Sequence, residues 1–238
     1  MEPVNQPLLP AAFRYSIPVF LGYIALGAAF GIVAIERGYP WYLAVTMGIV
    51  MYAGAGQFIA VGLFAAGVSL WEAVLIEFVV NARHMAYGIS MLRRFQNAGV
   101  FRFYLIFALT DETFALLSSL PPAGSAELPR RGRFMFLVSL LDHIYWNTGI
   151  LIGALAGSLI PWNFDGVGFA LTALFIVLMI EQMFRVKRPA PFVISGITAA
   201  AAVFLLPGEL SGRLSLLSAM IISLGLVQFF ETRFGTEC

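Results

Sequence analysis

The sequence predicts an all-α integral membrane protein, a polytopic bundle of seven to eight transmembrane helices of which at least one is broken. Of its 238 residues, 60% are hydrophobic and 11% are charged, and the mean hydropathy is +0.88. A soluble domain has about a quarter of its residues charged. The apolar residues also form runs that are long enough to cross a bilayer, separated by turns of glycine, proline and arginine. We therefore expect one transmembrane domain over residues 1–238.

The first predicted span covers residues 17–35 and carries three glycines. Gly22, Gly27 and Gly31 place small residues on one helical face, which lets a neighbouring helix approach closely. The segment before this span lacks the basic start of a cleaved signal peptide. The first span is thus expected to act as the insertion signal itself.

The second predicted span, residues 41–65, contains the stretch M-Y-A-G-A-G-Q-F at residues 51–58. Glycine weakens a helix, and the amide of Gln57 needs a partner where water is absent. We predict that the helix opens at Gly54 to Gln57 beside a cavity, where freed N–H groups bind a carboxylate and freed carbonyls bind an ammonium group. The alternative is a tightly packed notch with one interhelical hydrogen bond.

The next two predicted spans, residues 70–92 and 103–120, carry ionisable side chains. At about 100° per residue, a helix places Glu77, Asn81 and His84 on one face, with Arg83 pointing about 120° away. The later span has adjacent carboxylates, Asp111 and Glu112, which a helix directs to different sides.

The second part of the chain begins after a long loop and contains further apolar runs. Residues 121–133 form the longest predicted loop and suggest two halves, 11–122 and 130–234, with similar glycine patterns. Further spans are predicted at residues 134–160, at 167–184, after Pro189 and Pro191 to about Leu206, and at 214–230.

The predicted topology contains one conflict. Eight crossings with a cytoplasmic N-terminus place most basic loops inside, as such loops prefer, but place Arg93 and Arg94 outside. Either that loop is an exception, or one of the second to fourth segments enters and leaves on the same side.

The carboxylates of the fourth span are the strongest candidates for function, because a charge within a membrane costs at least a few kcal/mol and is kept mainly for pairing or transport. Asp111 or Glu112 would bind a substrate ammonium group or carry a proton. The structural alternative is a static ion pair with Arg83 or Arg102. Similarly, His84 belongs either to a proton relay or to a hydrogen-bonded ladder.

Other polar residues have weaker functional interpretations, and several classes of function are disfavoured. Asp142 and His143 lie only about nine residues into their span, which is compatible with the membrane boundary. A net charge of +1 gives no footprint for nucleic acid, and no phosphate-binding loop, metal-ligand spacing or hydrolase nucleophile pattern is visible. We expect no cofactor, no metal and no enzymatic activity.

Three segments, Y-A-G-A-G-Q-F at 52–58, V-N-A-R-H-M-A-Y-G at 80–88 and L-T-D-E-T-F-A-L at 109–116, resemble the signatures of the AzlC-type branched-chain amino-acid permeases. The segments I-Y-W-N-T-G-I-L-I-G-A-L-A-G and G-F-A-L-T-A-L-F-I are similar to that family as well. The resemblance covers nearly the whole chain. Met47 stands where a small hydroxyl residue is expected, and Asp142 and His143 stand before the tryptophan segment where other polar residues are expected. These departures concern the identity of the substrate more than transport itself.

The resemblance implies a multi-pass exporter of branched-chain or similar hydrophobic amino acids in the bacterial inner membrane. It also implies proton coupling and a small AzlD-like membrane subunit as partner, besides membrane lipids. Two rivals remain, namely a passive channel for small polar or zwitterionic solutes and a membrane-embedded enzyme.

From these observations we assign roles to sixteen residues. In the predicted substrate site, the carboxylate lies at the break, the ammonium faces Asp111, and the side chain lies against Phe58 and Phe114. The substrate-binding residues are Tyr52, Gly54, Ala55, Gly56, Gln57, Phe58, Asn81, Asp111 and Phe114. The candidates for proton coupling are Glu77, His84 and Glu112, and those for a structural or charge-pairing role are Arg83, Asp142, His143 and Asn147.

Overall fold

The computed structural model describes residues 7–96, 98–120, 128–159 and 190–205, and residues 176, 180, 183 and 222. The chain forms two compact units, Met1–Thr172 and Ala173–Cys238. In the described part every regular element is a helix, which confirms the predicted all-α class. The helices are α1 (Leu8–Glu36), α2 (Trp41–Val50), α3 (Gly54–Ala65), α4 (Leu70–Phe95), α5 (Phe101–Phe107), α6 (Asp111–Ser119), α7 (Leu128–Leu159) and α9 (Ala190–Leu205).

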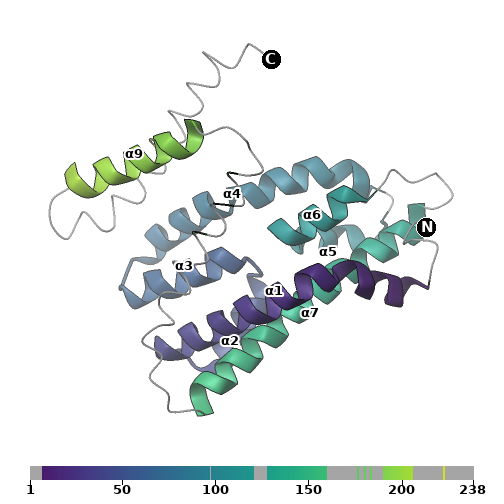
Figure 1. The fold of residues 1–238 in the computed structure, drawn as a ribbon, viewed down its shortest axis with the longest axis horizontal. Helices are drawn as coiled ribbons and strands as arrows, with labels where there is room; N and C mark the ends of the chain where they lie inside the picture. Colours follow the sequence, from purple (N-terminus) through teal and green to yellow (C-terminus); the bar gives the residue numbers. More distant parts are fainter. Residues whose placement is uncertain are drawn as a thin grey trace. The chain divides into compact units, whose positions relative to one another are not determined.

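Helices α1 and α7 pack along each other (Figure 1), and each of them also contacts several other helices. Helices α2 and α5 pack against α7, and α3 packs against α4. The segments Leu8–Glu36 and Arg130–Leu159 are long and apolar enough to cross a membrane. The seventh predicted span corresponds to α9, whereas the sixth and eighth lie outside the described residues apart from four single positions.

Glycine accounts for the close contact between α1 and α7. A Cβ atom on Gly27 would lie 2.6 Å from the carbonyl oxygen of Trp146, and one on Gly149 would lie 2.6 Å from that of Ile24. Gly22 was predicted to share this face, but no atom lies within 4 Å of its Cβ position. The glycines in the contact are Gly27 and Gly31 on α1, and Gly149, Gly153 and Gly157 on α7.

Two of the predicted spans are pairs of short helices. The second span is interrupted at residues 51–53, between α2 and α3. The break therefore precedes the predicted position, and Gly54 to Gln57 form the first turn of α3. The fourth span was predicted to be continuous, but it is interrupted at residues 108–110, between α5 and α6. The side chain of Thr110 caps α6 by accepting a hydrogen bond from the Thr113 N–H group.

The arginines near residue 130 belong to a helix and not to the predicted loop, because α7 begins at Leu128. Two arginines bind the end of α6, whose last carbonyl groups lack partners within the helix. Arg94 Nη1 donates to the Leu120 carbonyl oxygen over 2.8 Å, and Arg131 Nη2 donates to the same oxygen over 3.3 Å.

Large apolar side chains are exposed on the first unit. Leu21 of α1 is 72% exposed, Trp71 of α4 is 79% exposed and Phe103 of α5 is 73% exposed. Soluble monomers rarely expose so many large apolar groups, whereas a lipid-facing surface requires them. The buried core gathers residues from α1, α4, α5, α6, α7 and the segments next to them, namely Ala11, Ala12, Met91, Phe95, Ala98, Leu105, Leu109, Leu117, Leu120, Phe134, Met135 and Val138.

Candidate functional site

The first turn of α3 faces two polar side chains of α4. A Cβ atom on Gly56 would lie 2.7 Å from Glu77 Oε2 and 2.8 Å from Asn81 Nδ2. Only glycine leaves room for this approach. Ala53, at the N-cap position, has no side chain that caps the helix, so the first N–H groups of α3 keep their binding capacity. The break in the second span and the polar face of α4 thus meet at one place.

Glu77 and Asn81 form the part of the predicted stripe that borders the break. Asn81 Nδ2 donates to Glu77 Oε2 over 2.8 Å. Glu77 Oε1 and Asn81 Oδ1 are buried and have no hydrogen-bond partner among the atoms that the structure describes. His84 lies further along α4, where its ring is 6.0 Å from that of Tyr87. The predicted stripe therefore divides into a pair at the break and a histidine beside an aromatic ring.

The break itself is held against α7 by an aromatic contact. Tyr52 is buried and has a φ of 40°, a left-handed conformation that a tyrosine rarely adopts. Its ring lies 4.1 Å from the ring of His143. His143 Nε2 is 3.2 Å from the Gly48 carbonyl oxygen, and its Nδ1 is 2.9 Å from the Tyr104 hydroxyl. His143 therefore joins α2, the break and α5 to α7.

Gln57 is fully buried in the first unit and contacts α7 through its amide oxygen. Trp146 Nε1 donates to Gln57 Oε1 over 2.8 Å. Because an indole N–H can only donate, this contact fixes the orientation of the amide. Gln57 Nε2 finds no acceptor within the described part of the chain. The next residue, Phe58, is 1% exposed and its ring lies 5.3 Å from that of Phe30.

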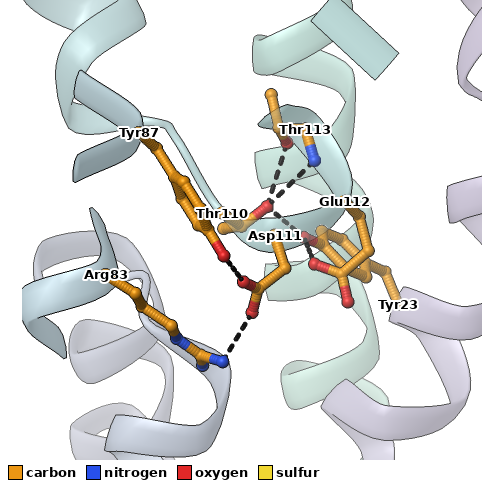
Figure 2. A network of polar contacts seen from close by, with 7 residues as sticks. All are labelled: Tyr23, Arg83, Tyr87, Thr110, Asp111, Glu112 and Thr113. Atoms are coloured by element: carbon orange, nitrogen blue, oxygen red, sulfur yellow. Dashed lines mark hydrogen bonds and ion pairs between the residues drawn. The ribbon is translucent and has the colours of Figure 1, made fainter. Parts of the chain in front are cut away.

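Asp111 and Glu112 point to different helices, as predicted (Figure 2). Asp111 Oδ2 lies 3.1 Å from Arg83 Nη1 of α4, and Tyr87 donates to Asp111 Oδ1 over 2.6 Å. This geometry favours the ion-pair alternative for Asp111. Phe114, placed by the sequence in the substrate site, stacks on Tyr87 with ring centroids 4.4 Å apart.

Glu112 faces α1 instead. Tyr23 donates to Glu112 Oε2 over 2.8 Å, and the same hydroxyl contacts Thr110 Oγ1. On the other side of α6, Thr113 donates to Asp142 Oδ2 over 2.8 Å. Asp142 is fully buried between helices, so its position relatively early in the fifth span does not leave it at the surface of the bundle.

Sequence reasoning did not identify Tyr23, Tyr87, Thr110 or Thr113 as parts of the polar network. The tyrosines gave no signal, since aromatic residues are common throughout the chain. The two threonines could have been found, because Thr110 followed by two acids is typical of a helix start. Asn147, predicted to be structural, donates to the His143 carbonyl oxygen over 2.9 Å.

Comparison with known proteins agrees with the sequence motifs. The model of the AzlC protein family matches residues 18–160. The branched-chain amino acid transport protein AzlC of Bacillus subtilis is 35% identical over 217 residues, which cover 91% of this chain and 83% of the relative. An uncharacterized membrane protein of Helicobacter pylori is 44% identical over 174 residues, covering 73% of this chain and 75% of the relative.

The inner membrane protein YgaZ of Escherichia coli is 32% identical over 183 residues, or 71% of each chain. No solved structure matches. All sixteen residues to which the sequence assigned roles lie within the part that the family model covers, from Tyr52 to Asn147.

Proposed function

The chain belongs to the AzlC family of membrane proteins, and from this premise we propose that it is a secondary transporter that exports branched-chain or similar hydrophobic amino acids. The proposal takes its substrate class from the Bacillus relative, whose name gives branched-chain amino acid transport. The structural observation that carries it is the interrupted second span, where the start of α3 meets Glu77 and Asn81.

The break suits a zwitterion because it combines groups of both polarities. The free N–H groups at the start of α3 and the positive end of its dipole would hold the substrate carboxylate. The ammonium group would be held by Glu77, whose Oε1 is buried without a partner in the described residues, and by the freed carbonyls at the end of α2. The two charges of an amino acid are close together, so adjacent binding groups are needed.

This proposal changes the roles of two carboxylates. Asp111 was the expected partner of the ammonium group, but both of its oxygens contact α4 side chains. Glu77 borders the break directly and takes that role here. Of the three candidates for proton coupling, Glu112 remains the one that is linked by hydrogen bonds to other helices, and we assign coupling to it.

The setting of the proposed transporter is the bacterial inner membrane, with export driven by the proton gradient. We further propose a small AzlD-like membrane subunit as its partner. The exposed apolar surfaces of the first unit offer area for both lipid and such a subunit.

Counterflow in vesicles tests the proposal. The protein, with and without the small subunit, is reconstituted into vesicles loaded with unlabelled leucine, and uptake of labelled leucine, isoleucine and valine is measured. A transporter shows saturable uptake that is stimulated by substrate on the other side. A passive channel shows no such stimulation, and that result would contradict the proposal.

The variant Glu77→Gln examines the assigned site. It removes the charge that binds the ammonium group while keeping a side chain of similar size, so we expect counterflow to fall at least tenfold. Glu72→Gln on the same helix is the control. Glu72 lies in the capping box of α4 with Ser69, and glutamine can also fill this position of a capping box. Equal counterflow in the two variants would remove Glu77 from the site.

A further inference from the structure

A half-buried carboxyl group, that of Glu112, and a fully buried one, that of Asp142, lie on different helices and are joined by three hydroxyl groups. Tyr23 of α1 is 2.8 Å from Glu112 Oε2, and the same hydroxyl is 2.5 Å from Thr110 Oγ1. Thr110 Oγ1 is 3.1 Å from Thr113 Oγ1, which is 2.8 Å from Asp142 Oδ2. We call these five residues the hydroxyl chain; Figure 2 shows all of them except Asp142.

The number of protons decides how the hydroxyl chain can be satisfied. It contains four oxygen-to-oxygen contacts, and each hydrogen bond needs one proton. The three hydroxyl groups supply one proton each. If both carboxyl groups were ionised, one of the four contacts would hold no proton and two oxygen lone pairs would face each other. One additional proton, on either carboxyl group, satisfies every contact.

We infer that Glu112 and Asp142 share a single proton, which passes between them through Tyr23, Thr110 and Thr113. In one state Glu112 is protonated and donates to Tyr23, and the hydroxyl groups donate in turn toward an ionised Asp142. In the other state every hydrogen bond is reversed. This inference rests on the proposed function for its role in transport, because it identifies the group that carries the coupling proton.

The proton transfer balances within the hydroxyl chain. The Glu112 proton moves to the Tyr23 oxygen, the Tyr23 proton moves to Thr110, the Thr110 proton to Thr113, and the Thr113 proton to Asp142. Four O–H bonds break and four form. No cofactor or outside reactant is required, and the net change is one proton removed from Glu112 and one added to Asp142.

Charged and titratable groups surround both ends. The charged groups that interact with Glu112 are Asp111 and its ion-pair partner Arg83. Tyr52, Tyr104 and Tyr145 interact with Asp142 from the break, α5 and α7. Glu112 Oε2 and Asp142 Oδ2 are bound by hydroxyl groups and not by cations in the described structure. Neither carboxyl group is therefore kept ionised by an ion pair at that oxygen.

The position of the hydroxyl chain connects the proton with the proposed substrate site. Asp142 lies one helical turn before Trp146, which donates to Gln57 in the first turn of α3. Asp142 Oδ1 has no partner among the described residues, and neither has Gln57 Nε2. A change of charge on Asp142 therefore takes place on the same face of α7 that holds the start of α3.

Infrared spectroscopy of the purified full-length protein tests the shared proton without any assay of transport. The carbonyl stretch of a protonated carboxyl group is separate from that of carboxylate and shifts in D₂O. Spectra are taken near pH 8, where exposed carboxyl groups are ionised. We expect Glu112→Gln and Asp142→Asn each to lose the signal of one protonated carboxyl group, because the introduced amide donates to the hydroxyl chain and leaves the other residue ionised.

The double variant should lose no more signal than either single variant. Loss in only one of the single variants, or twice the loss in the double variant, would overturn the inference. Asp111→Asn is the control, since Asp111 forms an ion pair and should contribute no such signal. If a variant fails to fold, ¹³C labelling of aspartate or glutamate in the wild-type protein replaces it. Absence of an aspartate component in the band would then overturn the inference.

Transport provides the second readout. Tyr23→Phe removes the hydroxyl that links Glu112 to Thr110, so we expect it to keep counterflow and to lose at least tenfold in accumulation driven by a pH gradient. Tyr15→Phe is the matched control on α1, because Tyr15 contacts the Leu116 carbonyl and Ser119 outside the hydroxyl chain. Equal accumulation in both variants would contradict the route. A wild-type protein without pH-driven accumulation would contradict the proposed function, while the infrared test would still decide the shared proton.

Discussion

The α-carbon of Gly56 approaches the carboxylate of Glu77 so closely that a Cβ atom at position 56 would lie 2.7 Å from Oε2. We therefore expect Gly56→Ala to displace Glu77 and to reduce counterflow at least tenfold, although alanine favours a helix more than glycine does. Counterflow of labelled leucine measures the effect. Gly62→Ala on the same helix is the control, because its Cβ would meet no atom within 4 Å. Wild-type counterflow in Gly56→Ala would show that the close approach has no role in binding.

The ion pair between Asp111 and Arg83 is expected to stabilise the bundle. Asp111→Asn should lower the free energy of unfolding by about 2 kcal/mol, since Arg83 loses a charged partner. The double variant with Arg83→Gln should recover part of that loss. Thermal unfolding in detergent measures both. Counterflow should persist in folded Asp111→Asn; its loss at unchanged stability would instead place Asp111 in the substrate site.

The contact between α1 and α7 should not tolerate a side chain on Gly27. A branched side chain would overlap the Trp146 carbonyl, and overpacking of this kind costs about 1–3 kcal/mol or more. We expect Gly27→Val to lower the unfolding temperature strongly and Gly22→Val, on the exposed side of α1, to change it little. Size-exclusion chromatography after heating compares the two. Similar behaviour of both variants would contradict the packing.

His84 separates two routes for the coupling proton. The hydroxyl chain does not include it, and its ring lies 6.0 Å from that of Tyr87, on the opposite side of Asp111 from Glu112 in the sequence of contacts described above. We therefore expect His84→Gln to retain pH-driven accumulation within about twofold of the wild type. Vesicles with an imposed pH gradient provide the measurement. Selective loss of accumulation, with counterflow intact, would restore His84 as the proton carrier.

The helical class and the first break could be predicted because each depends on local composition. Long apolar runs predict helices in a membrane protein, and paired glycines followed by Gln57 indicate an interruption. The second break was missed because Leu109 continues the apolar run. Its signal was the N-cap residue Thr110 with acids in the first turn, a pattern that indicates a helix start even within an apolar span.

The partners of the polar groups could not be predicted, because they come from helices whose neighbours the sequence does not specify. The sequence left Arg83 and Arg102 as alternative partners for carboxylates, and only the fold selects Arg83 for Asp111. The glycine patterns of α1 and α7 are another case in which the sequence does not specify which helices are neighbours. Their similarity suggested a duplication, which stays a prediction, but their packing against each other is sufficient reason for both to be rich in glycine.

Backbone contact between α1 and α7 also restricts how the protein can move. Glycines bring carbonyl oxygens of one helix directly against the backbone of the other, so sliding or rotation there would produce immediate overlap. These two helices should therefore act as a fixed frame. Whatever motion exposes the substrate to one side of the membrane and then to the other must be carried by the interrupted spans and α4, with residues 51–53 and 108–110 as the places where the backbone can bend.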